Sequence, residues 1–162
     1  MKRDDEIEII RASLAHYATR GAFRSFSEVP GRPGKLEFRF LWFRDVTFRV
    51  TYEAAARTLT FVDFLPAVPA RSPMDSELRR FIRGRSASSL PDHRRVDLKK
   101  VRLAVTNRRG AISLVFSLKA AHIEYGVKKS VHLAYDVLMD FLNESQYVEY
   151  NINHFNLNPE MA

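Results

Sequence analysis

The chain has 162 residues, a formal net charge of +7, 46% hydrophobic residues and no cysteine. A chain of this length and composition can bury about two-thirds of its unfolded surface in one globular domain, so it needs no disulfide or metal to fold. The absence of cysteine excludes thiol nucleophiles, iron–sulfur clusters and zinc ribbons. Any metal site would have to use histidine and carboxylate ligands.

The start of the chain does not have the pattern of a targeting segment. It turns acidic at Asp4, Asp5 and Glu6, where a signal peptide would carry its apolar core, and no run of about 18 apolar residues follows anywhere. We therefore expect a cytoplasmic protein with no membrane partner.

The first half of the chain predicts one helix followed by three strands. Apolar residues at helical spacing, ended by Gly21, predict a helix over residues 5–20. Residues 22–35 contain two prolines and two glycines within five positions and predict an irregular connection. Alternating apolar and polar residues then predict a hairpin over 36–52 and a third antiparallel strand over 58–64.

The second half predicts a helix, a hairpin and a last helix. Ser72 and Pro73 have the types expected at the start of a helix that ends at Gly84, and residues 85–95 predict a loop. Alternation over 101–106 and 112–118 predicts a hairpin with its turn at 107–110. An apolar stripe predicts a helix over 127–144, which completes a domain over 1–146. The tail, 147–162, alternates like a short extended segment, and its aromatic residues indicate that it docks on the domain.

This element order, α-β-β-β-α-β-β-α, predicts an α+β domain in which helices pack on one face of an antiparallel sheet. Over residues 5–144 the order and lengths resemble the type III secretion chaperone-like fold, which the YbjN family of bacterial proteins is also thought to share. The resemblance implies a non-enzymatic, often dimeric protein that binds or regulates other proteins. Secretion chaperones are typically acidic whereas this chain is basic, so no functional residue is carried over.

We find no pattern that predicts catalysis, a cofactor or a metal site. The six glycines do not form a phosphate-binding loop, and the five histidines lack metal-ligand spacing. His132 and Asp136 stand one helical turn apart, as a base and its orienting carboxylate do, but we interpret them as part of a solvated polar face. An enzyme whose pocket is assembled from residues distant in sequence stays open as a third alternative.

The positive charge is concentrated in residues 71–109, which hold twelve basic and four acidic residues. Such a segment is typical of proteins that bind nucleic-acid phosphates, and also of proteins with acidic protein partners. The candidate anion- or nucleic-acid-binding residues are Arg79, Arg80, Arg83, Arg94, Arg95 and Lys99. A nucleic-acid-associated protein is the alternative function.

The leading hypothesis comes from the second face of the predicted sheet. Leu41 and Phe43 fall on the register opposite to the core side chains, and either Val62 or Phe64, together with Val115, is expected to join them. An apolar patch on this face would mark a protein interface. We therefore expect a non-enzymatic, chaperone-like or regulatory domain that acts as a homodimer or binds a peptide, with Leu41, Phe43, Val62 and Val115 at the interface.

Overall fold

A computed structural model describes residues 3–157 of the chain. These residues form four α-helices and six strands, with three short 3-10 turns near the C-terminal helices. The helices are α1 (Arg3–Thr19), α2 (Pro73–Gly84), α3 (Ile123–Met139) and α4 (Val148–His154). The strands are β1 (Phe23–Val29), β2 (Lys35–Trp42), β3 (Val46–Glu53), β4 (Thr58–Leu65), β5 (Val101–Arg108) and β6 (Ala111–Leu118). None of these helices is both long and apolar enough to cross a membrane.

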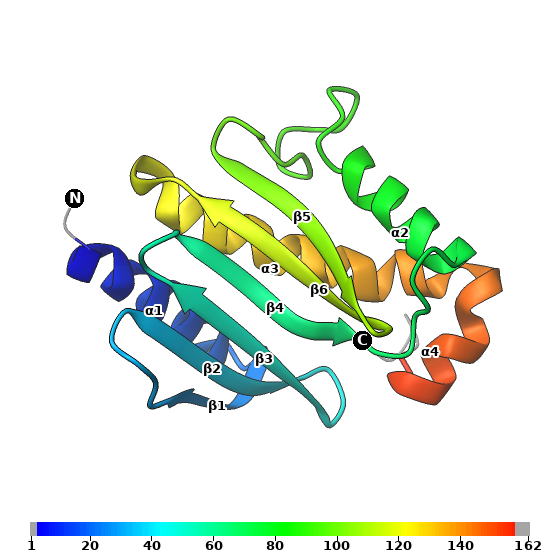
Figure 1. The fold of residues 1–162 in the computed structure, drawn as a ribbon, viewed down its shortest axis with the longest axis horizontal. Helices are drawn as coiled ribbons and strands as arrows, with labels where there is room; N and C mark the ends of the chain where they lie inside the picture. Colours follow the sequence, from blue (N-terminus) through cyan, green and yellow to red (C-terminus); the bar gives the residue numbers. More distant parts are fainter. Residues whose placement is uncertain (1–2, 158–162) are drawn as a thin grey trace.

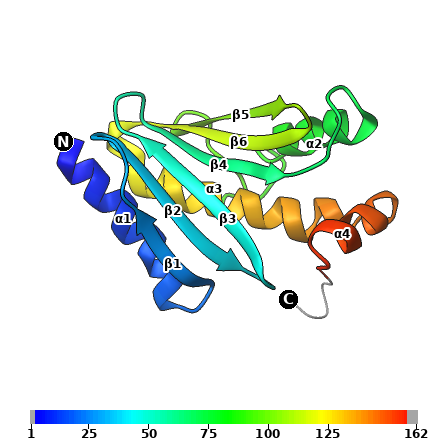
Figure 2. The same cartoon turned by 60° about the horizontal axis from the view of Figure 1, so that its bottom comes forward.

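The strands form one antiparallel sheet in the order β1-β2-β3-β4-β6-β5. Helices α1 and α3 run side by side behind this sheet, while α2 lies beside its β5 edge (Figures 1 and 2). The predicted fold class, an α+β domain with helices on one face of an antiparallel sheet, is therefore confirmed. After β4 the chain passes through α2 to β5 and then returns through β6, which pairs with β4. Strand β5 is therefore left at one edge of the sheet.

The core lies between the sheet and α1 and α3, and its strand residues are the alternating apolar positions of the sequence. One cross-strand row runs through Phe38, Val50, Phe61, Leu114 and Val105 from β2 to β5. The first four of these side chains are fully buried, whereas Val105, at the edge, is half-buried. In this row the core therefore ends at Val105, although Val101 of the same strand is fully buried.

Two glycines fit the places where the backbone needs them. In the β5–β6 hairpin, Arg109 and Gly110 both have positive φ, as a two-residue type I′ turn requires, and the Gly110 amide donates to the Asn107 side chain. In α3, a side chain at Gly126 would place its Cβ 2.4 Å from Leu118 of β6. This helix can therefore approach the sheet closely.

The prediction that residues 22–35 are irregular is wrong for the first part of that range, where β1 pairs with β2. Phe23 and Phe26 both pack on the core but stand three positions apart, which hides the period of two. The reason is a bulge: the register shifts between Arg24 and Ser27, and Ser25 has a φ of 51°.

The C-terminal elements also differ from the prediction. The last long helix begins at Ile123 and ends at Met139 rather than spanning 127–144, and a 3-10 turn takes over at Phe141. The predicted extended segment after Tyr147 is instead α4. Tyr147, Asn151 and Phe155 are buried at intervals of four residues, while the alternating apolar positions Val148 and Ile152 are exposed. The helix forms because the buried side chains follow helical spacing.

Candidate functional site

The predicted interface residues do not form one patch. Leu41, Val62 and Val115 are half-buried and lie on the sheet face that α1 and α3 leave open. Thr47 pairs with Leu41, and Arg49 pairs with Val62, so polar side chains separate these two apolar residues. Val115 pairs with Thr60 and lies diagonally from Val62. The open face is therefore mixed in character rather than apolar.

Phe43 does not share that face, which corrects its predicted place. It follows the end of β2 with a φ of 64°, stacks on Trp42 at 4.8 Å between ring centroids and contacts Tyr135 of α3 at 5.8 Å. The turn reverses the strand alternation, because a left-handed residue breaks the extended backbone. Phe64 is also buried in the core.

The predicted anion-binding residues are divided between ion pairs within the chain and exposed positions. Arg79 is 3.1 Å from Asp75 and also donates to the Val105 carbonyl at 2.9 Å, while Arg95 is 2.5 Å from Asp92. Arg80, Arg83, Arg94 and Lys99 are exposed. The six cations therefore do not form a single surface for a nucleic-acid backbone.

A groove lies between α2 and the β5 edge of the sheet, with a volume of about 460 Å³. Its apolar lining includes Ile82, Leu98, Leu103 and Val105. Leu98 is 49% exposed, which is unusual for a leucine next to two other apolar side chains. Two arginines of α2, Arg79 and Arg83, complete the rim. The groove is thus apolar at its floor, and the exposed Arg83 carries the positive charge of its rim, because Arg79 is paired with Asp75.

The β5 backbone has hydrogen-bonding groups on the groove side. Because Arg79 reaches the Val105 carbonyl from α2, the peptide groups of Val105 point away from β6, and so do those of Leu103 two residues earlier. Of the other outward residues, Val101 donates its amide to the Asp97 carbonyl at 3.2 Å. Among residues 3–157 we find no partner for the Leu103 amide and carbonyl, which are therefore available to an added strand.

Side chains on the two faces of β5 differ sharply. Val101, Leu103 and Val105 point toward the helix layer, whereas Arg102 and Arg108 are exposed on the open face of the sheet. A strand added at this edge would alternate in the same way. Its residues would therefore face the apolar groove and the two arginines in turn.

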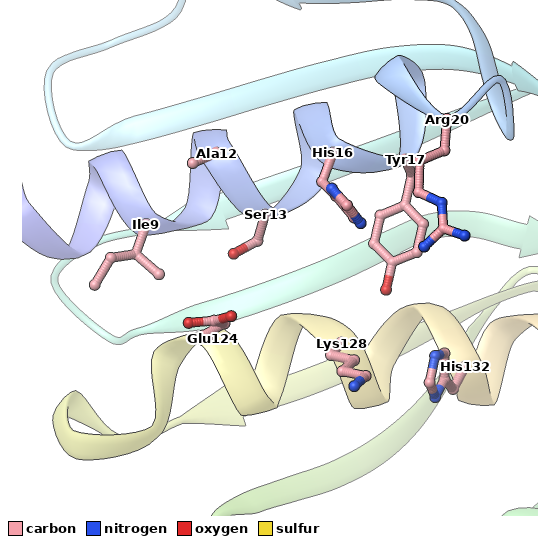
Figure 3. Close-up of a pocket in the computed structure, with 9 residues that line it drawn as sticks. All are labelled: Ile9, Ala12, Ser13, His16, Tyr17, Arg20, Glu124, Lys128 and His132. Carbon is pink, nitrogen blue, oxygen red and sulfur yellow. The ribbon is translucent and has the colours of Figure 1, made fainter.

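A second hollow, of about 520 Å³, lies between α1 and α3 on the other side of the molecule. Figure 3 shows Ser13, His16 and Tyr17 of α1 directed toward α3, with Lys128 and His132 on the facing helix. Burial raises the pKa of Tyr17, and burial, assisted by Lys129 and Lys128, lowers the pKa of His132. The hollow therefore combines polar groups in a partly desolvated setting.

Nucleophilic catalysis uses a nucleophile within hydrogen-bonding distance of its base. Among residues 3–157, no hydrogen bond joins Ser13 or Tyr17 to His16 or His132. His16 and Tyr17 meet only ring to ring, with centroids 5.9 Å apart. Within residues 3–157, no three histidine or carboxylate side chains are close enough to hold a metal ion.

No protein-family model, curated protein or solved structure matches this chain. The resemblance to chaperone-like folds therefore stays a prediction, and the function has to be argued from geometry. The groove residues Ile82, Leu98 and Leu103 were not among the predicted sites. Leu98 lies between Asp97 and Lys99, but Phe38 lies between Glu37 and Arg39 and is buried, so this charged setting does not mark Leu98 as exposed and the sequence carries no clear signal for the groove.

Proposed function

We propose that this chain is a non-enzymatic binding protein of the cytoplasm that recognises an acidic, extended peptide at the β5 edge of its sheet. The observation that carries the proposal is the combination of outward backbone groups at Leu103 with an apolar groove and arginines on both sides of the strand. Backbone pairing supplies affinity in such complexes, and the side-chain pockets supply specificity.

The alternation of β5 defines the peptide. Residues of the added strand that face the groove meet Leu103 and Val105, so they should be apolar and β-branched. Residues that face the open side lie near Arg102 and Arg108, so they should be acidic. The net excess of basic residues over 71–109 would also speed the encounter with an acidic partner.

The test is fluorescence anisotropy with a labelled octapeptide in which glutamate and valine alternate. We expect saturable binding by the native chain and weaker binding by Leu98→Glu, by roughly tenfold, because the new carboxylate repels the peptide and removes an apolar contact (~1.4 kcal/mol). Ile152→Glu is the matched control: Ile152 is 59% exposed on α4, away from the groove, and this variant should bind like the native chain.

Two further reagents make the outcome decisive. The same octapeptide with lysine in place of glutamate should not bind, since it would oppose the arginines. A 20-base-pair DNA duplex tests the nucleic-acid alternative, which requires an affinity that falls steeply with salt. Equal binding of the acidic and basic peptides, or tight DNA binding that Leu98→Glu leaves unchanged, would contradict the proposal.

The predicted homodimer belongs to the same proposal but would need a different surface or a suitable strand register. Antiparallel pairing of two β5 strands centred on Val105 would place Arg102 of one copy opposite Arg108 of the other, and like charges in such pairs are destabilising. That register is therefore disfavoured, and a second copy would need either another register, such as one centred on Leu103, or the open face around Leu41, Val62 and Val115. Light scattering on the peptide complex gives the number of 18.8 kDa chains that it contains.

A further inference from the structure

A third cavity, of about 220 Å³, lies between α3 and the loop that follows α2. The loop is closed by a hydrogen bond of 2.9 Å from the Val96 amide to the Arg85 carbonyl. Arg85, Arg94 and Lys129 line the cavity, together with Asp136 and two histidines, His93 and His132. None of the residues that line it also lines the β5 groove.

Two cations at this cavity have unused hydrogen-bond donors. The Arg85 guanidinium stacks 4.7 Å from the centre of the Phe81 ring and donates to Asp136 at 3.3 Å, but its buried Nε has no hydrogen-bond partner among residues 3–157. Lys129 is 7% exposed, and its Nζ donates to the His93 carbonyl at 3.1 Å, with no carboxylate in ion-pair contact within the same residues. Buried donors of this kind are costly unless a ligand satisfies them.

The charges at the cavity do not cancel. Arg85, Arg94 and Lys129 contribute three positive charges and Asp136 one negative charge, and burial lowers the pKa of His132, which favours its neutral form. The excess of two positive charges would balance the two negative charges of a phosphate or phosphate monoester dianion. The volume is below the roughly 300–1,000 Å³ typical of pockets for drug-sized ligands, which favours a small anion.

We propose that this cavity is a binding site for a phosphate group, with the Arg85 guanidinium, the Lys129 ammonium and the Arg94 guanidinium as its donors. Arginine presents a planar fork to phosphate oxygens, and a lysine ammonium adds a compact charge, which is a common division of labour at phosphate sites. The same chemistry would accept free phosphate or the phosphoryl group of a small monoester.

The test is isothermal titration calorimetry with inorganic phosphate and, separately, with phenyl phosphate at constant ionic strength. We expect saturable one-to-one binding, weakened about ten- to a hundredfold in Lys129→Met, because a charge-assisted hydrogen bond to the ligand is lost. Lys128→Met is the matched control. It removes the same charge from the neighbouring position, which is exposed and faces the other hollow, so phosphate affinity should change less than twofold.

The two ligands distinguish the source of the phosphate, since a site for a monoester should prefer phenyl phosphate. Arg94→Gln changes an exposed side chain and gives a second readout should Lys129→Met misfold, and it should also weaken binding. Equal losses in Lys128→Met and Lys129→Met would indicate general charge attraction and overturn the proposal. So would the absence of saturable heat with both ligands. The peptide measurement at the β5 groove uses different residues, so either proposal can fail alone.

Discussion

At the scale of single residues, Lys129 is the most unusual group in the structure. Burial lowers its pKa, and the neighbouring charge of Lys128 lowers it further, while Asp136 and Asp92 only partly oppose these effects. A lowered pKa in the folded state means that the charged amine destabilises the fold. The cost is present at neutral pH and disappears as pH rises from the folded pKa toward the unfolded value of about 10.4.

We therefore predict that Lys129→Met makes the ligand-free protein more stable at pH 7, by about 1 kcal/mol. The advantage should shrink as the pH approaches 10, because the native lysine then loses its proton. Urea unfolding of both proteins at pH 7 and pH 9.5 measures the difference. Lys128→Met, at an exposed position, should differ from the native chain by less than about 0.5 kcal/mol at either pH. A destabilised Lys129→Met at pH 7 would show that the amine has a structural role.

At the scale of secondary structure elements, α4 is the segment whose attachment can be tested most simply. Phe155 is 5% exposed and stacks on Phe48 of β3 at 6.4 Å between centroids, so the chain after residue 147 contributes to the core. The buried Asn151 strengthens this attachment, since it donates to the Leu142 carbonyl at 3.2 Å and accepts from the Leu157 amide at 2.8 Å.

Phe155→Ala should lower the free energy of unfolding by about 3 kcal/mol, the usual cost of removing a buried phenyl ring. Ile152→Ala, in the same helix but exposed, should change it by less than about 0.5 kcal/mol. Thermal unfolding followed by circular dichroism compares the two variants. If both melt like the native chain, α4 does not pack on the sheet as described.

The same elements show why sequence patterns predicted most of the fold and missed part of it. Strands β2, β3, β5 and β6 alternate without interruption, so period and register followed from residue types such as Phe38 and Val50. In β4 the register shifts after Phe61, where Asp63 has a φ of 49°. In β1 the bulge at Ser25 interrupts the alternation, so Phe26 does not follow Phe23 at the spacing of two residues that a regular strand requires. In α4 the exposed Val148 and Ile152 alternate with polar residues as the residues of a strand do. The helix becomes evident only from the burial of Asn151 and its hydrogen bond to the Leu142 carbonyl.

At the scale of the whole molecule, the sites depend on how distant segments meet, which a local pattern does not record. The β5 groove combines α2, the loop at Leu98 and a strand edge, and the phosphate cavity joins Arg85 to Lys129 across 44 positions of sequence. Local charge did point to residues 71–109, and most of the groove comes from that segment. Arg79 pairs with Asp75 one helical turn away, which is a local contact, whereas its hydrogen bond to the Val105 carbonyl depends on tertiary structure. The pairing of Arg85 with Asp136 depends on it as well.

The arrangement also separates two kinds of recognition. Residues of α3 and of the loop after α2 line the small cavity, whereas residues of α2 and β5 line the groove. Figure 1 shows α2 beside the β5 edge of the sheet. We infer that a partner strand pairs with the Leu103 backbone in this groove.

Amide hydrogen exchange by NMR tests that claim most directly, with and without the octapeptide of alternating glutamate and valine. Outward amides of an unpaired edge strand exchange readily, and pairing protects them. We expect slower exchange at Leu103 on addition of the peptide, with no change at Ser27 on the opposite edge strand β1. Unchanged exchange at Leu103 while the peptide is bound, or protection confined to residues outside β5 and α2, would contradict it.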